Sequence, residues 1–284
     1  MVEVVSEHQS FGGVQGFYRH DSTVIGLPMR FSVYQPPQAK LGKVPVLFFL
    51  AGLTATEETF MIKAGAQRLA AEFGLMLVSG DTSPRNTGID GATKDWDFGE
   101  GAGFYLDATE APWSRHFRME SWLTQELREL IVSGFPARAD RVGIFGHSMG
   151  GHGALTLALR HPDIYRSVSA FAPISAPTRC AWGEKALGNY LGAERSTWNE
   201  HDASELMRQR KKPFPAGILI DQGSSDKFLL DGQLQSEAFE AACAGAGQPL
   251  TMRRHAGYDH GYYFISTFIA DHLSFHRDIL LSGS

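Results

Sequence analysis

The sequence predicts an α/β fold in which a mostly parallel central sheet is flanked by helices on both faces. Short apolar segments alternate with helical segments along the chain, an order typical of strand–helix–strand units. The apolar segments carry few polar residues, as expected of strands that are buried on both sides. No repeat or low-complexity linker divides the 284 residues, so we expect a single domain over residues 1–284.

The first half of the chain contains the elements of one side of this sheet. The predicted elements are strands at residues 24–33 (with a bend at 26–28), 44–50 and 75–79, and a helix at 64–73. The helix is expected to end at Gly74, because glycine adopts the left-handed conformation that closes many helices. Residues 81–117 are rich in Gly, Asp and aromatic side chains and have no helical or strand period. We predict one long ordered loop there, and such loops inside compact domains are usually functional.

The second half continues the same alternation. The predicted elements are helices at residues 120–132, 154–159, 233–244 and 262–281, and strands at 142–145, 167–171, 216–221 and 250–255. The first of these helices is predicted from apolar residues at helical spacing, which are Leu123, Leu127, Leu130 and Ile131. Residues 173–212 are predicted as a second irregular insertion. Both insertions should lie over the carboxyl edge of the strands, where ligand sites of α/β proteins are found.

The segment around Ser148 indicates covalent catalysis. An apolar strand runs into Gly146-His-Ser-Met-Gly150, and a helix-forming segment follows directly. A G-x-S-x-G turn between strand and helix is the nucleophile elbow of the α/β-hydrolase fold. The turn strains the serine backbone, so the flanking positions need glycine. An incidental glycine-rich turn is the alternative, but the flanking strand and helix favour Ser148 as a nucleophile.

A serine nucleophile needs a base and an orienting acid, which follow it in this fold in the order Ser, Asp or Glu, His. Asp226 lies in a loop just after the strand at 216–221, and His260 lies in a loop directly before the last helix. We therefore predict a Ser148–His260–Asp226 triad, in which His260 moves the serine proton and Asp226 fixes the imidazole. The weaker alternatives are Asp221 or Asp231 as the acid and His255 as the base.

The developing oxyanion needs two backbone N–H donors. One belongs to the residue after the nucleophile, which is Met149, and the other to the loop after the apolar strand at 44–50. Gly52-Leu-Thr54 occupies that loop, so we expect the N–H of Leu53 to be the second donor. The alternative is an ordinary glycine turn.

Composition excludes several other classes of function. The net charge is −5, and the basic residues are scattered, which argues against nucleic acid or a membrane surface as partner. The two cysteines have no metal-ligand spacing, and no H-E-x-x-H, phosphate-loop or dinucleotide pattern occurs, so we expect no metal and no cofactor. Few cysteines and the lack of a signal-peptide pattern favour the cytoplasm.

Several long segments resemble the S-formylglutathione hydrolase, or esterase D, family. The matching segments are residues 49–54 with 57–60, 81–85, 96–109, 146–153, 171–174, 221–229, and 258–260 with 262–265. The resemblance implies hydrolysis of S-formylglutathione to formate and glutathione, by a cytoplasmic and often dimeric enzyme. In that family the triad and oxyanion donors fall on the residues assigned above. Two departures are Ala55, where many members have cysteine, and Gly261, where serine is common.

Other readings of the same residues are a general short-chain carboxylesterase or an acyltransferase. For a glutathione thioester, Trp96, Phe98 and Trp182 are candidates for lining the mouth of the pocket, with core packing as the alternative. The basic residues of the insertions are candidates for pairing with the carboxylates of glutathione, or else are solvated surface charges: Arg85, Lys94, Arg179, Lys185 and Lys227.

Overall fold

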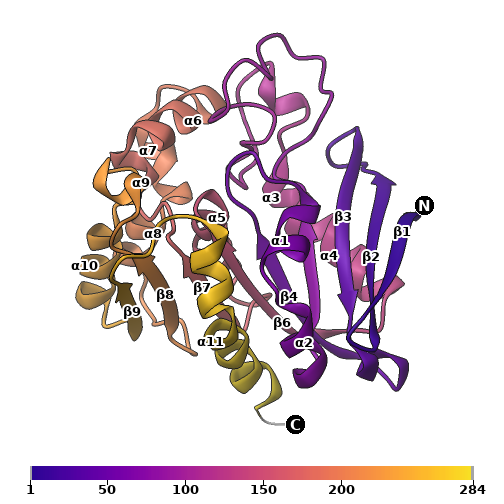
Figure 1. Ribbon diagram of the computed structural model, residues 1–284. Coiled ribbons are helices and arrows are strands. Elements are labelled where there is room, and N and C mark those ends of the chain that lie inside the picture. The colour runs from indigo at the N-terminus through magenta and orange to yellow at the C-terminus, as the bar shows by residue number, and fades with distance from the viewer. Residues whose placement is uncertain (1, 283–284) are drawn as a thin grey trace.

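The computed structural model describes residues 2–282, in which nine strands form one sheet (Figure 1). The strands are β1 (Val2–Ser10), β2 (Gly13–Asp21), β3 (Pro28–Gln35), β4 (Val44–Leu50), β5 (Met76–Gly80), β6 (Ala137–His147), β7 (Ser167–Phe171), β8 (Ile218–Gly223) and β9 (Leu250–His255). Their order across the sheet is β1-β2-β3-β5-β4-β6-β7-β8-β9. The strands from β5 to β9 in this order pair in parallel, and β1, β2 and β3 add an antiparallel edge.

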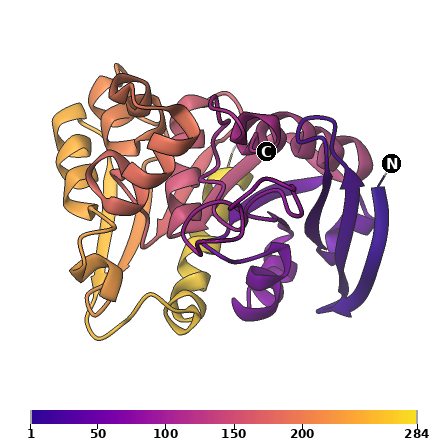
Figure 2. The same cartoon turned by 90° about the horizontal axis from the view of Figure 1, so that it is seen from above.

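Helices cover both faces of the sheet, which confirms the α/β-hydrolase fold class. The α-helices are α1 (Glu57–Lys63), α2 (Gln67–Phe73), α3 (Met119–Ser121), α4 (Arg128–Gly134), α5 (Met149–Arg160), α6 (Ala181–Leu191), α7 (Arg195–Trp198), α8 (Ala203–Gln209), α9 (Lys227–Leu230), α10 (Ser236–Ala246) and α11 (Tyr262–Leu281). One face carries α1, α2 and α11, and the other carries α4, α5, α8 and α10 (Figure 2). Short 3₁₀ turns are η1 (Pro37–Lys40), η2 (Trp113–Arg115), η4 (Pro177–Arg179) and η5 (Asn199–His201), and η3 (Trp122–Leu127) is a π-helical stretch between α3 and α4.

The register of the central strands brings the predicted site residues to one edge. Leu50 at the end of β4 lies opposite Gly146 near the end of β6, and His147 lies opposite Phe171 at the end of β7. Because parallel strands end at the same edge, the turns after β4, β6 and β8 all lie at that edge of the sheet. The two insertions lie above this edge in Figure 1, as the sequence predicts.

Three expectations about the elements need correction. The helix predicted at 64–73 is α2, which begins only at Gln67 because Gly65 adopts a φ of 67°; Gly74 does end it, with a φ of 69°. The preceding helix α1, at residues 57–63, was not predicted. The insertion at 173–212 is not irregular, since it contains α6, α7 and α8. These helices are short, and the sequence feature that marks them is their N-cap residues. The side chains of Glu194 and Asp202 accept hydrogen bonds from backbone N–H groups at the starts of α7 and α8.

The third correction concerns β1 and β2, which the sequence patterns did not indicate. β1 is an edge strand whose side chains are mostly exposed, so its sequence shows no alternation of apolar and polar residues. In β2, Gly16 interrupts the pattern because the ring of Tyr18 occupies the space of a Cβ at that position. Both strands are therefore specified by packing that is not visible in a local window.

The core beneath the site is aromatic. Phe49 of β4 stacks on Phe60 of α1 with ring centroids 3.9 Å apart, and Phe145 of β6 meets both rings edge-on. All three side chains are fully buried. Full burial of each such side chain contributes on the order of 1.5–3 kcal/mol to folding, so the strands that carry the site are held rigidly.

Candidate active site

Ser148 lies on a strained turn between β6 and α5. Its φ of 58° and ψ of −119° place a non-glycine residue in a region that few residues adopt. The Ser148 N–H donates to the carbonyl of Phe171, 3.0 Å away. A Cβ at Gly146 would strike the backbone of Gly150, and a Cβ at Gly150 would strike the backbone of Leu50. The two glycines are therefore required because backbone crowds the turn on both sides.

Asp226 and His260 meet beside this turn. The Nδ1 of His260 lies 2.5 Å from the Oδ2 of the buried Asp226. The other carboxylate oxygen accepts the N–H of Phe228 at 2.8 Å, and Gln222 donates to Oδ2 at 3.1 Å. Burial alone raises the pKa of Asp226, but the hydrogen bond and charge of His260 outweigh it and hold that pKa below its ordinary value. Asp226 is thus an ionised partner of His260, held in place as the N-cap residue of α9.

Ser148 and His260 both line one cavity of about 370 Å³. Among the described residues no hydrogen bond joins the Ser148 hydroxyl to His260. Catalytic hydrogen bonds in unliganded sites are often long and shorten when substrate binds. The neighbouring His147 lies with its ring centroid 4.4 Å from that of His260. Burial, followed by the nearby His260, lowers the pKa of His147 well below its ordinary value, so His147 is neutral there.

The loop after β4 lies directly against the elbow. A Cβ at Gly52 would come within 3.2 Å of the Ser148 Cβ, and Leu53 and Thr54 line the cavity. Thr54 has a φ of 68°, and its N–H donates to the carbonyl of Gly101. Within residues 2–282 neither the Leu53 N–H nor the Met149 N–H has a hydrogen-bond acceptor. Two unengaged donors therefore flank Ser148.

The cavity wall combines aromatic side chains with the ammonium group of Lys63, which lies 5.8 Å from the ring centroid of Tyr262. The lining residues are Gly52, Leu53, Thr54, Ala55, Thr59, Lys63, Trp96, His147, Ser148, Trp182, Phe228, His260 and Tyr262. Trp96 and Trp182 thus line the cavity. Phe98 does not, and its expected place there is corrected: it is buried, with ring centroids 4.7 Å from those of Trp113 and Tyr190. Its apolar side chain packs under the loop rather than facing the cavity.

Most basic residues predicted to face the substrate are engaged elsewhere. Arg85 pairs with Asp81, Arg179 with Glu205, Lys185 with Asp95 and Asp97, and Lys227 with Asp231. Lys94 is not among the cavity-lining residues. Lys63, at the end of α1, lines the cavity, and within the described part of the chain no carboxylate pairs with it. Lys63 was not among the basic residues expected to face the substrate, because nothing in the sequence distinguishes a cation on a cavity wall from one on the open surface.

The alternative triad residues have other partners. Arg253 binds Asp221 through two hydrogen bonds of 2.6 Å, and His272 and His255 lie 3.4 Å from the same carboxylate. Burial would raise the pKa of Asp221, but the hydrogen bonds from His272 and Arg253 lower it to about 2. Asp231 is exposed and paired with Lys227. These contacts give Asp221 and His255 a structural role in the sheet.

Residues 2–282 contain neither a metal-binding cluster nor a helix that could span a membrane. No cluster of three or more His, Cys, Asp or Glu side chains has an arrangement suited to a metal ion. No helix in this range combines the length and the hydropathy that crossing a bilayer requires.

The fold and the site together define a class of protein: a hydrolase with the α/β-hydrolase fold. Comparison with known proteins narrows the class. A family model described as "Putative esterase" matches residues 22–275. The S-formylglutathione hydrolase of Paracoccus denitrificans is 52% identical over 278 residues, with 98% of each chain covered. That of Mus musculus is 50% identical over 276 residues, covering 97% of this chain and 98% of its own.

A solved structure agrees with these relatives. The S-formylglutathione hydrolase from Agrobacterium tumefaciens superposes with a TM-score of 0.94 at 48% identity, covering 98% of this chain and 99% of its own. This chain belongs to the S-formylglutathione hydrolase family.

Proposed function

We propose that this protein is a serine thioesterase that hydrolyses S-formylglutathione to formate and glutathione. The observation that supports the proposal most strongly is the contact of 2.5 Å between Asp226 and His260, since His260 lines the same cavity as the strained Ser148. Membership of the S-formylglutathione hydrolase family supports the substrate. No cofactor is needed, because the reaction is acyl transfer to water.

In the proposed mechanism the Ser148 oxygen attacks the formyl carbon while Nε2 of His260 takes the serine proton. The N–H groups of Leu53 and Met149 stabilise the oxyanion of the tetrahedral intermediate, which collapses as the carbon–sulfur bond breaks. Glutathione leaves as the thiol by taking the proton from His260, or leaves as a thiolate while His260 gives its proton to solvent, so His260 is neutral again before deacylation. Water, deprotonated by His260, then attacks the formyl-enzyme, and formate leaves as Ser148 regains its proton. The carboxylate of Asp226 stabilises the imidazolium in both halves.

The cavity wall supports a small acyl group and an anionic leaving group. Leu53 and Trp182 lie on the cavity beside Ser148, and exclusion of larger acyl groups by such walls gives strong selectivity. Glutathione carries two carboxylates, and the Lys63 ammonium is a cation on the same wall without an ion-pair partner in the described chain. We assign Lys63 to one of these carboxylates. A thiolate leaves readily because its conjugate thiol has a reference pKa of about 8.5.

Comparison of two substrates tests the proposal. We expect kcat/KM for S-formylglutathione to exceed that for p-nitrophenyl acetate by at least roughly tenfold, which corresponds to about 1.4 kcal/mol. Equal or reversed values would favour a general short-chain carboxylesterase. Ester formation that outruns acid formation when an alcohol is added would favour an acyltransferase.

The site itself is tested by Ser148→Ala. We expect this variant to fold normally and to lose turnover of both substrates, while retained turnover would overturn the triad assignment. The family resemblance also leads us to propose a homodimer in the cytoplasm. Light scattering of the purified protein tests the dimer, since a monomer mass would contradict it.

A further inference from the structure

We infer that Arg85, held by the buried Asp81, is a positioning residue. Through the carbonyl of Ala55 it fixes the loop at residues 51–55, which we call the oxyanion loop. The inference rests on the proposed role of the Leu53 N–H as an oxyanion donor. Arg85 touches neither the cavity nor Ser148, so any effect on catalysis is transmitted through the backbone of the loop at residues 51–55.

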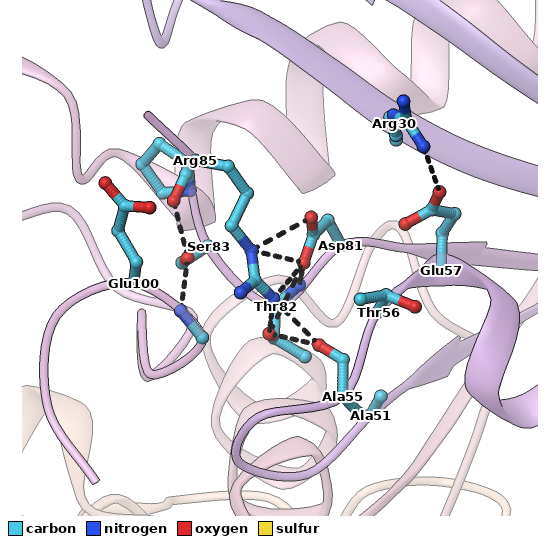
Figure 3. A network of polar contacts seen from close by, with 12 residues as sticks. Arg30, Ala51, Ala55, Thr56, Glu57, Asp81, Thr82, Ser83, Arg85 and Glu100 are labelled. Carbon is cyan, nitrogen blue, oxygen red and sulfur yellow. Dashed lines mark hydrogen bonds and ion pairs between the residues drawn. The ribbon is translucent and has the colours of Figure 1, made fainter. Parts of the chain in front are cut away.

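The carbonyl of Ala55 accepts two side-chain donors. The Oγ1 of Thr82 lies 2.7 Å from it, and the Nη2 of Arg85 lies 3.0 Å from it (Figure 3). Arg85 also donates to Thr82 Oγ1 at 3.2 Å, so the two donors support one another. One of these donors is charged, and hydrogen bonds with a charged partner are roughly twice as strong as neutral ones.

Asp81 anchors Arg85 to the sheet. It follows β5 directly, only 4% of it is exposed, and its N–H donates to the carbonyl of Arg30. Its carboxylate accepts Nη2 of Arg85 at 2.7 Å and Nε at 3.1 Å, a two-point contact that fixes the plane of the guanidinium. Burial raises the pKa of Asp81, and the hydrogen bond and charge of Arg85 oppose that rise. The carboxylate therefore needs Arg85, and Arg85 has little freedom to rotate away.

The long loop at residues 81–117, which contains Thr82 and Arg85, also holds the other side of the oxyanion loop. The carbonyl of Gly101 accepts the N–H of Thr54 at 2.9 Å, and the hydroxyl of Tyr105 donates to the carbonyl of Ala51 at 2.7 Å. Gly101 in turn donates to Ser83 Oγ at 2.7 Å. Residues on each side of Leu53 are thus pinned by residues 82–105, while the Leu53 N–H is left without an acceptor in the described chain. This arrangement holds the donor in place before substrate arrives.

The hydrogen bonds of Arg85 are made within the protein. Asp81 and the Ala55 carbonyl accept from its Nε and Nη2 groups, and Arg85 does not line the cavity that contains Ser148. A positioning role and a substrate-binding role predict different kinetics. Loss of oxyanion stabilisation lowers kcat for every acyl substrate, whereas loss of a glutathione contact raises KM for glutathione thioesters alone.

The experiment compares Arg85→Met and Thr82→Val with wild type on both S-formylglutathione and p-nitrophenyl acetate. Removing one oxyanion donor outright costs about 10²–10³ in kcat. For a displaced donor we expect kcat to fall about tenfold to a hundredfold with Arg85→Met, by the same factor on both substrates, with KM changed less than about threefold. Thr82→Val, which removes one donor without exposing a buried charge, should show the same pattern at a smaller size. Arg68→Met, which removes an exposed pair with Glu72 on α2, is the matched control and should behave as wild type.

Three results would overturn the inference. One is unchanged kcat in both variants once active sites are counted by titration with a fluorophosphonate. Another is an increase in KM confined to S-formylglutathione, which would make Arg85 a substrate contact. The third is a lower unfolding midpoint with unchanged kcat, which would make the pair purely structural. A failure of the proposed function would be distinguishable from these results, because it would appear as turnover by Ser148→Ala with Arg85 and Thr82 unchanged.

Discussion

Replacing Glu57 with glutamine should make the protein more stable at alkaline pH while changing little at acid pH. Glu57 begins α1, and only 3% of it is exposed. Its nearest cation is Arg30, with Nη1 3.9 Å from Oε1, and Asp81 adds a second negative charge in the same region (Figure 3). Burial, followed by the charge of Asp81, raises the pKa of Glu57 from 4.5 to about 7.

The sign follows from where the proton is bound. Between about pH 4.5 and pH 7 the folded protein retains the Glu57 proton that the unfolded chain releases, so the free energy of unfolding falls as pH rises through this window. About 1.5 pH units of the window lie above pH 5.5, and each unit corresponds to 1.36 kcal/mol. Wild type should therefore lose about 2 kcal/mol from Glu57 between about pH 5.5 and pH 8.5, and Glu57→Gln should not.

Urea unfolding followed by tryptophan fluorescence measures this difference. The quantity of interest is the free energy of unfolding of Glu57→Gln minus that of wild type at the two pH values. The matched control is Glu58→Gln, on the exposed side of the same helix turn. A difference that stays constant with pH, or that is greater at the acid value, would refute the idea that Glu57 is buried at a cost when ionised.

Three further predictions concern the site. Asp226→Asn should fold but lose on the order of 10³–10⁴ in kcat, because the amide no longer stabilises the imidazolium of His260; steady-state kinetics check this, and a loss below tenfold would contradict the assigned role. Lys63→Gln should raise KM for S-formylglutathione by about three- to thirtyfold and leave p-nitrophenyl acetate unchanged, and equal effects on both substrates would contradict the assigned carboxylate contact. Gly150→Ala should abolish soluble folded enzyme or turnover, since its Cβ would overlap the Leu50 carbonyl; circular dichroism with an activity assay checks this, and a fully active variant would show that the elbow tolerates side chains.

Sequence reasoning recovered the elements that combine a strong local pattern with deep burial. β7 and α11 agree with their predicted bounds, because a solid apolar strand and a long helix each carry their own signal. It failed for β1 and β2, where an exposed edge and a glycine needed by Tyr18 remove the alternation. It also failed in residues 173–212, where helices of four to eleven residues are too short for a clear period.

The residues of the candidate site also fall into those that could be predicted from the sequence and those that could not. Ser148, Asp226 and His260 could be chosen from sequence because each follows a strand in a turn with its own signature, and the structure brings the last two into contact. Lys63 and the engagement of Arg85 could not be found, since a free charge and a paired charge look alike in a sequence. Whether a basic residue is available to substrate depends on its ion-pair partner. The partner of Arg85 is Asp81, a buried residue directly after β5 that no motif singles out.

The division between the sheet edge and the walls of the cavity also has an evolutionary consequence. The proposed chemistry depends on turns fixed by neighbouring strands, whereas Trp96, Trp182 and Lys63 come from the insertions and from α1. Substitutions in those walls alter which acyl and leaving groups fit without moving the nucleophile. A lineage with this architecture can therefore change its substrates by point mutation while its reaction stays the same, and the insertions are the place to begin a directed-evolution library.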